Sequence, residues 1–128
     1  MSRFLLDSSF VIDLLNEIAA NQLGPARAWA ARHPGAELWI SPVTSAEVLE
    51  GASDATAVRE AFRAFRWQTI GRQHAERAAF RQRRAARRMG ENDAWQVAVA
   101  EGMDAVIVGH DAGAFERLGA GYDDHRRP

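Results

Sequence analysis

Four acidic residues of this sequence stand where a carboxylate could do chemistry. Asp7 directly follows the short apolar run RFLL, and Asp111 follows AVIVGH. Glu47 lies in SPVTSAEVLEG, and Asp93 lies in GENDAWQVAVA. Carboxylates within about 5 Å of one another repel by on the order of 1 to 3 kcal/mol per pair, unless a proton or a cation compensates. Oxygen ligands favour Mg²⁺ or Mn²⁺, and hydrated Mg²⁺ held by a few carboxylates suits phosphate chemistry.

Three of these acids also have a purely structural interpretation as helix caps. Asp7 and Asp111 fit N-caps, because aspartate accepts hydrogen bonds from the free amides of a first helical turn. Asp93, with Gln96 three residues later, fits a capping box. Each interpretation is reasonable for one residue alone, so the decision depends on whether the fold brings the acids together.

The fourth acid lies inside a predicted helix. Thr44 and Glu47 fit a capping box, but Ser41 and Pro42 already provide a cap and a first-turn proline. Glu47 is then an interior residue of this helix. Periodicity alone does not decide whether Glu47 or Glu50 is the acid that points inward.

Short apolar runs alternate with amphipathic patterns along the chain. Strands separated by helices require right-handed crossovers, so the expected fold class is α/β, a three-layer α/β/α sandwich around a small parallel sheet. Ligands bind such sheets beyond the carboxyl ends of the strands. This topology gathers the four acids at one edge, and a shared site explains them more simply than unrelated caps. The expected strands are 3–6, 37–40, 67–70 and 105–108, and the expected helices are 9–21, 25–33, 43–51, 55–65, 72–89, 93–102 and 112–118.

Composition limits the classes of protein that fit. A chain of 128 residues fits a single domain spanning 1–128. It has no cysteine, which excludes disulfides, thiolate metal sites and cysteine nucleophiles. All 16 basic residues are arginine, which excludes a P-loop and a Schiff-base lysine. Without a signal peptide pattern or an apolar stretch of membrane-spanning length, we expect a cytoplasmic protein.

Four separated motifs, in order, resemble a known family. They are FLLDSSFVIDLL, SPVTSAEVLEG, ENDAWQVAVAEGMDAVIV and GHDAGAFERL. With them the sequence resembles the PIN-domain ribonucleases, and especially the VapC toxins of bacterial toxin–antitoxin pairs, over essentially the whole chain. The resemblance implies a PIN-like α/β sandwich and an Mg²⁺-dependent endoribonuclease. It also implies an RNA substrate, a homodimer and neutralisation by a VapB-type antitoxin.

The acidic site of that family corresponds to Asp7, Glu47, Asp93 and Asp111, which selects Glu47 over Glu50. The resemblance implies that Asp7, Asp93 and Asp111 bind Mg²⁺, with Mn²⁺ as an alternative. It further implies that Glu47 orients or deprotonates the attacking water.

The chain departs from the family pattern at two positions. Ser8 stands where threonine is frequent, and it keeps a hydroxyl. Gly109 stands where threonine or serine is frequent, so a hydroxyl that would support Asp111 is missing. We expect Ser9 and Asn92 to support the acidic site, with loop and cap roles as the alternative.

An arginine-rich run, RQRRAARRMG, precedes Asp93. Continued as helix, it puts Arg81, Arg84 and Arg88 on one face and leaves the other arginines on another. These side chains are either a solvated face with cations near the helix C-terminus or contacts to phosphates beside the acids. We expect Asp13 to be solvated or salt-bridged rather than catalytic.

Other functions compete with this interpretation. A haloacid-dehalogenase-type phosphatase needs a second aspartate where the chain has Ser9, and a receiver domain needs a lysine. Two alternatives remain: a housekeeping RNA-processing PIN nuclease, and a non-catalytic metal-stabilised module that binds RNA or protein. The neighbouring gene tests the first, and a turnover assay tests the second.

Overall fold

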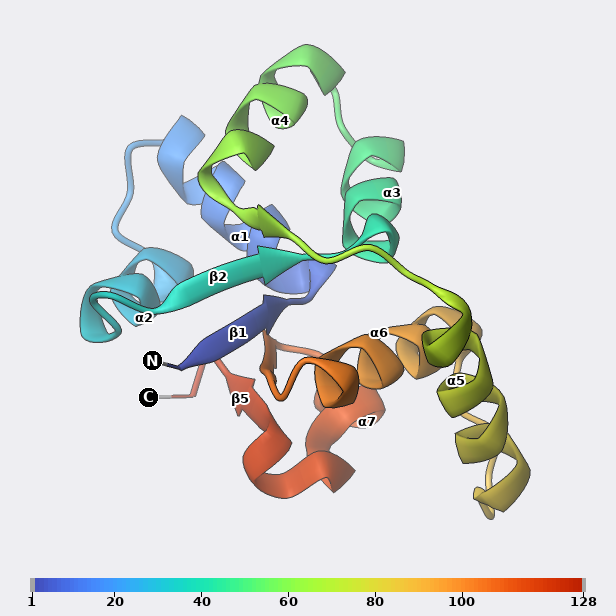
Figure 1. Ribbon diagram of the computed structural model, residues 1–128. Coiled ribbons are helices and arrows are strands. Elements are labelled where there is room, and N and C mark those ends of the chain that lie inside the picture. Colours follow the sequence, from blue (N-terminus) through green and yellow to red (C-terminus); the bar gives the residue numbers. More distant parts are fainter. Residues whose placement is uncertain (1, 128) are drawn as a thin grey trace.

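The computed structural model describes residues 2–127. Its centre is a five-stranded sheet with the strand order β3-β2-β1-β4-β5, in which every pair of neighbours is parallel (Figure 1). The three-layer α/β/α class predicted from the alternation of strands and helices is confirmed. The strands are β1 (Arg3–Leu6), β2 (Glu37–Ile40), β3 (Arg66–Trp67), β4 (Val106–Gly109) and β5 (Tyr122–Asp124).

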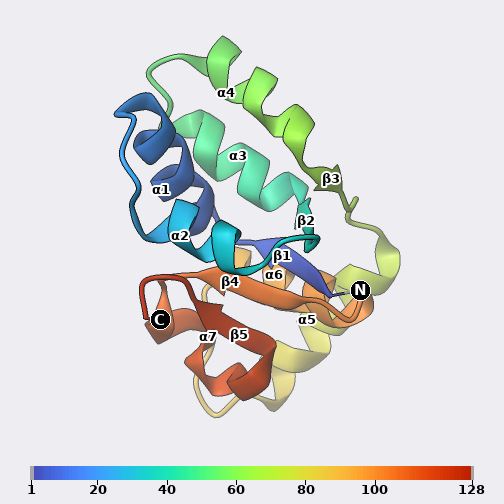
Figure 2. The same cartoon turned by 90° about the vertical axis from the view of Figure 1, so that its left-hand side faces the viewer.

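Helices cover both faces of the sheet. Helices α1 to α4 lie on one face, and α5 to α7 lie on the other (Figure 2). Among residues 2–127, no helix is both long and apolar enough to cross a bilayer. The helices are α1 (Ser8–Ala19), α2 (Pro25–Arg32), α3 (Pro42–Glu50), α4 (Ala55–Ala61), α5 (Arg72–Arg84), α6 (Glu91–Gly102) and α7 (Ala112–Phe115), with 3-10 turns at Phe62–Ala64 and Glu116–Gly121.

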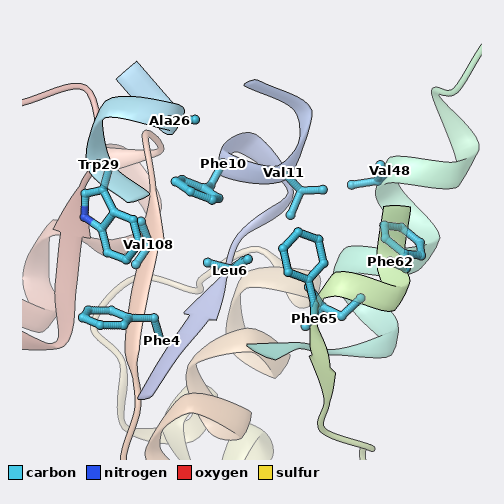
Figure 3. Packing of buried hydrophobic residues seen from close by; sticks show 11 residues of the cluster. Phe4, Leu6, Phe10, Val11, Ala26, Trp29, Val48, Phe62, Phe65 and Val108 are labelled. Atoms are coloured by element: carbon cyan, nitrogen blue, oxygen red, sulfur yellow. The ribbon is translucent and has the colours of Figure 1, made fainter. Parts of the chain in front are cut away.

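The central strand β1 supplies side chains to two cores. Phe4 and Leu6 point to the side of α1 to α4, where they pack with Phe10 and Trp29 (Figure 3). Leu5 points to the opposite side and packs against residues of α6, β4 and α7. Successive side chains of a strand alternate between its faces, so both layers are anchored to the strand that ends at Asp7.

Some predicted elements are shorter in the structure, and one strand was not predicted. The helix expected over 72–89 ends at Arg84, because the side-chain amide of Gln82 bonds to both the N–H and the carbonyl of Met89 and closes a loop between them. The strand expected over 67–70 is the short edge strand β3, which covers only Arg66–Trp67. The final strand, β5, was not predicted at all.

Candidate active site

Asp7 lies at the carboxyl end of β1, where it is the N-cap of α1. Its Oδ2 accepts hydrogen bonds from the hydroxyl of Ser9 at 2.7 Å and from the N–H of Ser9 at 3.3 Å. Only 6% of Asp7 is exposed. This burial raises the pKa of its carboxyl. The hydrogen bonds from Ser9 act in the opposite direction, and the negative charge of Asp111 raises the pKa as well. Asp7 is therefore a cap and a member of a charged cluster at once.

Asp93 lies in the first turn of α6, whose N-cap is Gly90. Burial and, in decreasing order, the charges of Asp111, Asp7 and Glu47 together raise the pKa of Asp93 to about 6. Because the charges of three other carboxylates act on Asp93, the four side chains lie near one another. The capping box predicted for Asp93 and Gln96 is wrong, because the amide of Gln96 bonds to side chains of another helix.

Glu47 is the acid of α3 that faces this space. Its side chain is half-buried and acts on Asp93, whereas Glu50, one turn later, is exposed. The side-chain amide of Asn92 donates to Glu47 Oε2 at 3.4 Å, which is a weak contact. Asn92 thus touches the acid cluster as expected.

Asp111 follows β4 and is the exposed N-cap of α7, where its Oδ1 accepts from the N–H of Ala114 at 3.3 Å. The loop before it is tied to Asp7 through Ser9, since the Ser9 hydroxyl oxygen also accepts from the N–H of His110 at 3.0 Å. A Cβ at Gly109 would lie 2.7 Å from Ser9 Oγ and 2.8 Å from Asp7 Cβ. The Ser9 hydroxyl therefore occupies the space that a side chain at Gly109 would take.

A buried chain of hydrogen bonds connects the elements that carry three of the acids. The Ser41 hydroxyl donates to Gln96 Oε1, the Gln96 amide donates to Thr44 Oγ1 at 2.9 Å, and the Thr44 hydroxyl donates to the carbonyl of Leu6 at 2.8 Å. Ser41 is the N-cap of α3 and Pro42 lies in its first turn, as predicted, but the Ser41 side chain makes no cap bond. The residue types of Ser41 and Gln96 also suit caps, and no local sequence pattern predicts the network.

A cleft of about 580 Å³ opens beside the acids. Asp13, which was expected to lie outside the acidic site, forms part of the wall of this cleft. It is salt-bridged to Arg126, one of the two environments predicted for it. The contribution of Arg126 was not anticipated. The cleft is lined by Asp7, Ser8, Ser9, Ile12, Asp13, His110, Asp111 and Arg126.

The carboxylates share one space without forming a closed cage. Within residues 2–127, no group of three or more His, Asp or Glu side chains is arranged so that the group could hold a metal ion. Mg²⁺ keeps several of its waters and is commonly held by one or two carboxylates. Carboxylates that form no such group fit a hydrated cation better than a fully ligated one.

A parallel α/β/α sandwich with four facing acids at its carboxyl edge defines a class of acidic-site α/β proteins. Within that class, the family model of the PIN domain matches residues 4–121, and the chain therefore belongs to the PIN-domain family. None of the curated protein sequences compared with the chain matches it significantly.

Solved structures share this fold. The toxin–antitoxin complex from Klebsiella pneumoniae has a TM-score of 0.75 and 24% identity, covering 94% of this chain and 96% of that one. VapBC-1 from nontypeable Haemophilus influenzae has a TM-score of 0.74 and 20% identity, with coverages of 98% and 99%. VapC20 from Mycobacterium tuberculosis, a sarcin-ricin loop cleaving toxin, has a TM-score of 0.71 and 20% identity, with coverages of 91% and 95%.

Proposed function

We propose that this protein is an Mg²⁺-dependent endoribonuclease and the toxin of a VapBC-type toxin–antitoxin pair. The observation that supports the proposal is the pKa of Asp93, which burial and the charges of Asp111, Asp7 and Glu47 raise to about 6, as expected for four carboxylates near one sheet edge. Its fold is also that of VapBC toxins, one of which is described as cleaving the sarcin-ricin loop. Metal binding would relieve the repulsion between these groups.

The acids have separate roles in this proposal. Asp7 and Asp93 hold the cation, and Asp111 binds it directly or through water. Bound Mg²⁺ would neutralise charge on the phosphate and acidify a coordinated water. Glu47 orients the attacking water and accepts its proton. Among residues 2–127 its carboxylate accepts one weak hydrogen bond, from Asn92, and is otherwise available.

Cleavage of RNA in Mg²⁺ tests the activity. We expect cleavage by the wild type, none in EDTA, and a loss of roughly 100-fold or more in Asp7→Asn. Glu47→Gln should show a comparable loss, and Glu50→Gln, one helical turn away, is its matched control. Cleavage that survives both EDTA and Asp7→Asn would overturn the assignment, and binding without turnover would favour the non-catalytic module.

A candidate docking groove for the antitoxin lies between α1, α3 and α4 of this protein. The groove has a volume of about 470 Å³ and is lined by apolar side chains that include Leu15, Val48 and Val58. Ile12 and Ile18 also line it and are 43% and 57% exposed. Solvent-exposed apolar side chains around a groove suit the apolar face of a partner helix. We therefore assign this groove to the VapB-type partner.

Co-expression with the adjacent small open reading frame tests the partner and separates a toxin from a housekeeping nuclease. Ile18→Glu should abolish rescue of growth by that gene product. Leu23→Glu is the matched control, because Leu23 is 75% exposed and lies outside the groove. Equal rescue of both variants would exclude this groove. The homodimer implied by the family resemblance is tested by light scattering of the purified chain.

A further inference from the structure

The final strand brings Arg126 to the acidic edge. Strand β5 pairs in parallel with β4, and in this register Asp124 lies opposite Gly109. The N–H of His125 then donates to the carbonyl of Gly109 at 3.2 Å. The residues that follow β5 therefore emerge beside the loop that carries Asp111, and Arg126 enters the wall of the cleft.

Asp13 holds Arg126 in a fixed orientation. Arg126 Nε lies 2.9 Å from Asp13 Oδ2, and Nη2 lies 2.9 Å from Oδ1, which is a two-pronged ion pair. Nε2 of the buried His125 lies 2.8 Å from the same Oδ2. Although burial opposes it, hydrogen bonding by Arg126 and His125 keeps the pKa of Asp13 below its ordinary value. The Asp13 carboxylate is thus ionised and is also held by the buried His125.

The guanidinium keeps donors available for a ligand. An arginine has five N–H groups, and the pair with Asp13 uses two of them. Within residues 2–127, the other guanidinium N–H groups of Arg126 make no hydrogen bond, and the side chain is 50% exposed. The cleft that Arg126 lines also contains Asp7 and Asp111. An oriented cation therefore shares a cleft with two acids.

We propose that Arg126 is a substrate-binding residue that holds a backbone phosphate of the RNA, next to the phosphate at the acids, with Asp13 as its positioning residue. The inference rests on the proposed function. A cleft lined with carboxylates repels every phosphate that a bound cation does not neutralise, so the neighbouring phosphate needs a positive partner. A guanidinium fork supplies that charge with a fixed geometry.

A purely structural role is the competing explanation, since the same ion pair also fastens the segment after β5 onto α1. Arg127 provides the matched control: it is the adjacent arginine, it pairs with Asp124, and it does not line the cleft. Arg126→Ala and Arg127→Ala change the net charge equally. Arg126→Lys keeps the charge and removes the fork.

The test measures binding of a short fluorescent single-stranded RNA in EDTA, steady-state cleavage in Mg²⁺, and the melting temperature of each variant. For Arg126→Ala we expect binding weaker by about five- to tenfold, a higher KM with little change in kcat, and a salt slope smaller by about 0.7. Arg126→Lys and Asp13→Asn should fall between it and the wild type. Arg127→Ala should bind and cleave like the wild type.

Two results would overturn the inference. One is an Arg126→Ala variant that melts lower but binds and cleaves RNA like Arg127→Ala, which assigns a structural role. The other is a wild type that binds RNA neither in EDTA nor in Mg²⁺. Failure of the proposed function gives a different result, namely a wild type that binds RNA without cutting it. That result removes the nuclease assignment, and the RNA binding of Arg126→Ala and Arg127→Ala still decides the role of Arg126.

Discussion

The side chains of Thr44 and Gln96 hydrogen-bond at 2.9 Å across the contact between α3 and α6, each one helical turn from an acid of the site. Glu47 lies three residues after Thr44, and Asp93 lies three residues before Gln96. The same Thr44 hydroxyl donates to the carbonyl of Leu6, the residue before Asp7. One buried hydroxyl thus connects the three elements that carry these acids.

Removal of that hydroxyl should disturb both stability and the site. Thr44→Val leaves the Gln96 amide and the Leu6 carbonyl without a partner in a buried position, at a cost of about 1–3 kcal/mol. RNA cleavage should fall roughly tenfold or more, because Glu47 and Asp93 lose their common support. Thermal melts and cleavage rates check this. Thr56→Val on exposed α4 is the control, and equal behaviour of the two variants would contradict the role of the network.

Asp93 gives the metal-free protein a specific pH dependence. Its folded-state pKa of about 6 exceeds the ordinary value of 3.8, so the folded state binds the proton more tightly than the unfolded state. Its contribution to stability is therefore complete below about 3.8 and is lost as the pH rises through about 6. The free energy of unfolding in EDTA should fall over this range by on the order of 1 kcal/mol, after discounting for solvent screening.

The variant Asp93→Asn tests this repulsion directly. Above about pH 6 it should melt at a higher temperature than the wild type in EDTA, since it removes one of four facing charges. It should also gain less stability from added Mg²⁺. Differential scanning calorimetry with and without Mg²⁺ measures both effects. A variant that melts lower in EDTA, as loss of a simple cap would cause, argues against the cluster, and Glu50→Gln should change neither quantity.

The central strands and the meeting of the acids could be predicted from sequence because their signals are local. Strands β1 and β2 are apolar runs bounded by polar residues, and their predicted limits of 3–6 and 37–40 are correct. Parallel topology follows from the alternation with helices, and topology then sends Asp7, Asp93 and Asp111 to one edge. Burial and charge at Asp93 agree with that placement.

The remaining features depend on contacts between distant residues. Strand β5 has the sequence YDD, which carries no apolar run, and it exists because β4 offers it an edge. Arg126, two residues beyond it, therefore could not be placed in the cleft. The end of α5 depends on the Gln82 amide bonding to Met89 seven residues away, which no helical pattern reports. The bonds that join Ser41 and Thr44 to Gln96 could not be predicted for the same reason.

That early end of α5 divides the arginines between two surfaces. Arg83 and Arg88 line a cleft of about 390 Å³ with Glu91 and Trp95 of α6. Arg81 lines a separate cleft and is paired with Glu101. The single face predicted for Arg81, Arg84 and Arg88 is therefore wrong, because Arg88 lies beyond the helix. The second cleft also contains Arg84, Arg87 and Arg117.

Salt-dependent RNA binding should distinguish these surfaces. The cleft of Arg83 and Arg88 adjoins the first turn of α6, which carries Asp93, so we expect it to contact phosphates. Replacing both arginines with alanine should lower the slope of log K against log salt by about 1.4, or about 0.7 per phosphate contact. The double alanine variant of Arg84 and Arg87 removes the same charge from the other surface. Equal loss of slope in the two double variants would refute the assignment to one cleft.

Gly109 is a position where the missing hydroxyl of the family pattern cannot simply be restored. A Cβ there would lie 2.7 Å from Ser9 Oγ, 2.8 Å from Asp7 Cβ and 3.1 Å from Asp7 Oδ2. Gly109→Ala should therefore destabilise the protein by about 1–3 kcal/mol and lower cleavage, because Asp7 must move. Urea titration and cleavage assays check both effects.

The double variant Gly109→Ala with Ser9→Ala identifies which contact matters. Deleting the Ser9 hydroxyl removes the shortest overlap, so the cost of the glycine substitution should be smaller in the Ser9→Ala background, as coupled neighbours require. The relief should be incomplete, since the 2.8 Å approach to Asp7 Cβ remains. Cleavage should not recover, because Ser9 also fixes Asp7 and the N–H of His110. Strict additivity of the two changes would mean that Ser9 does not occupy the space beside Gly109.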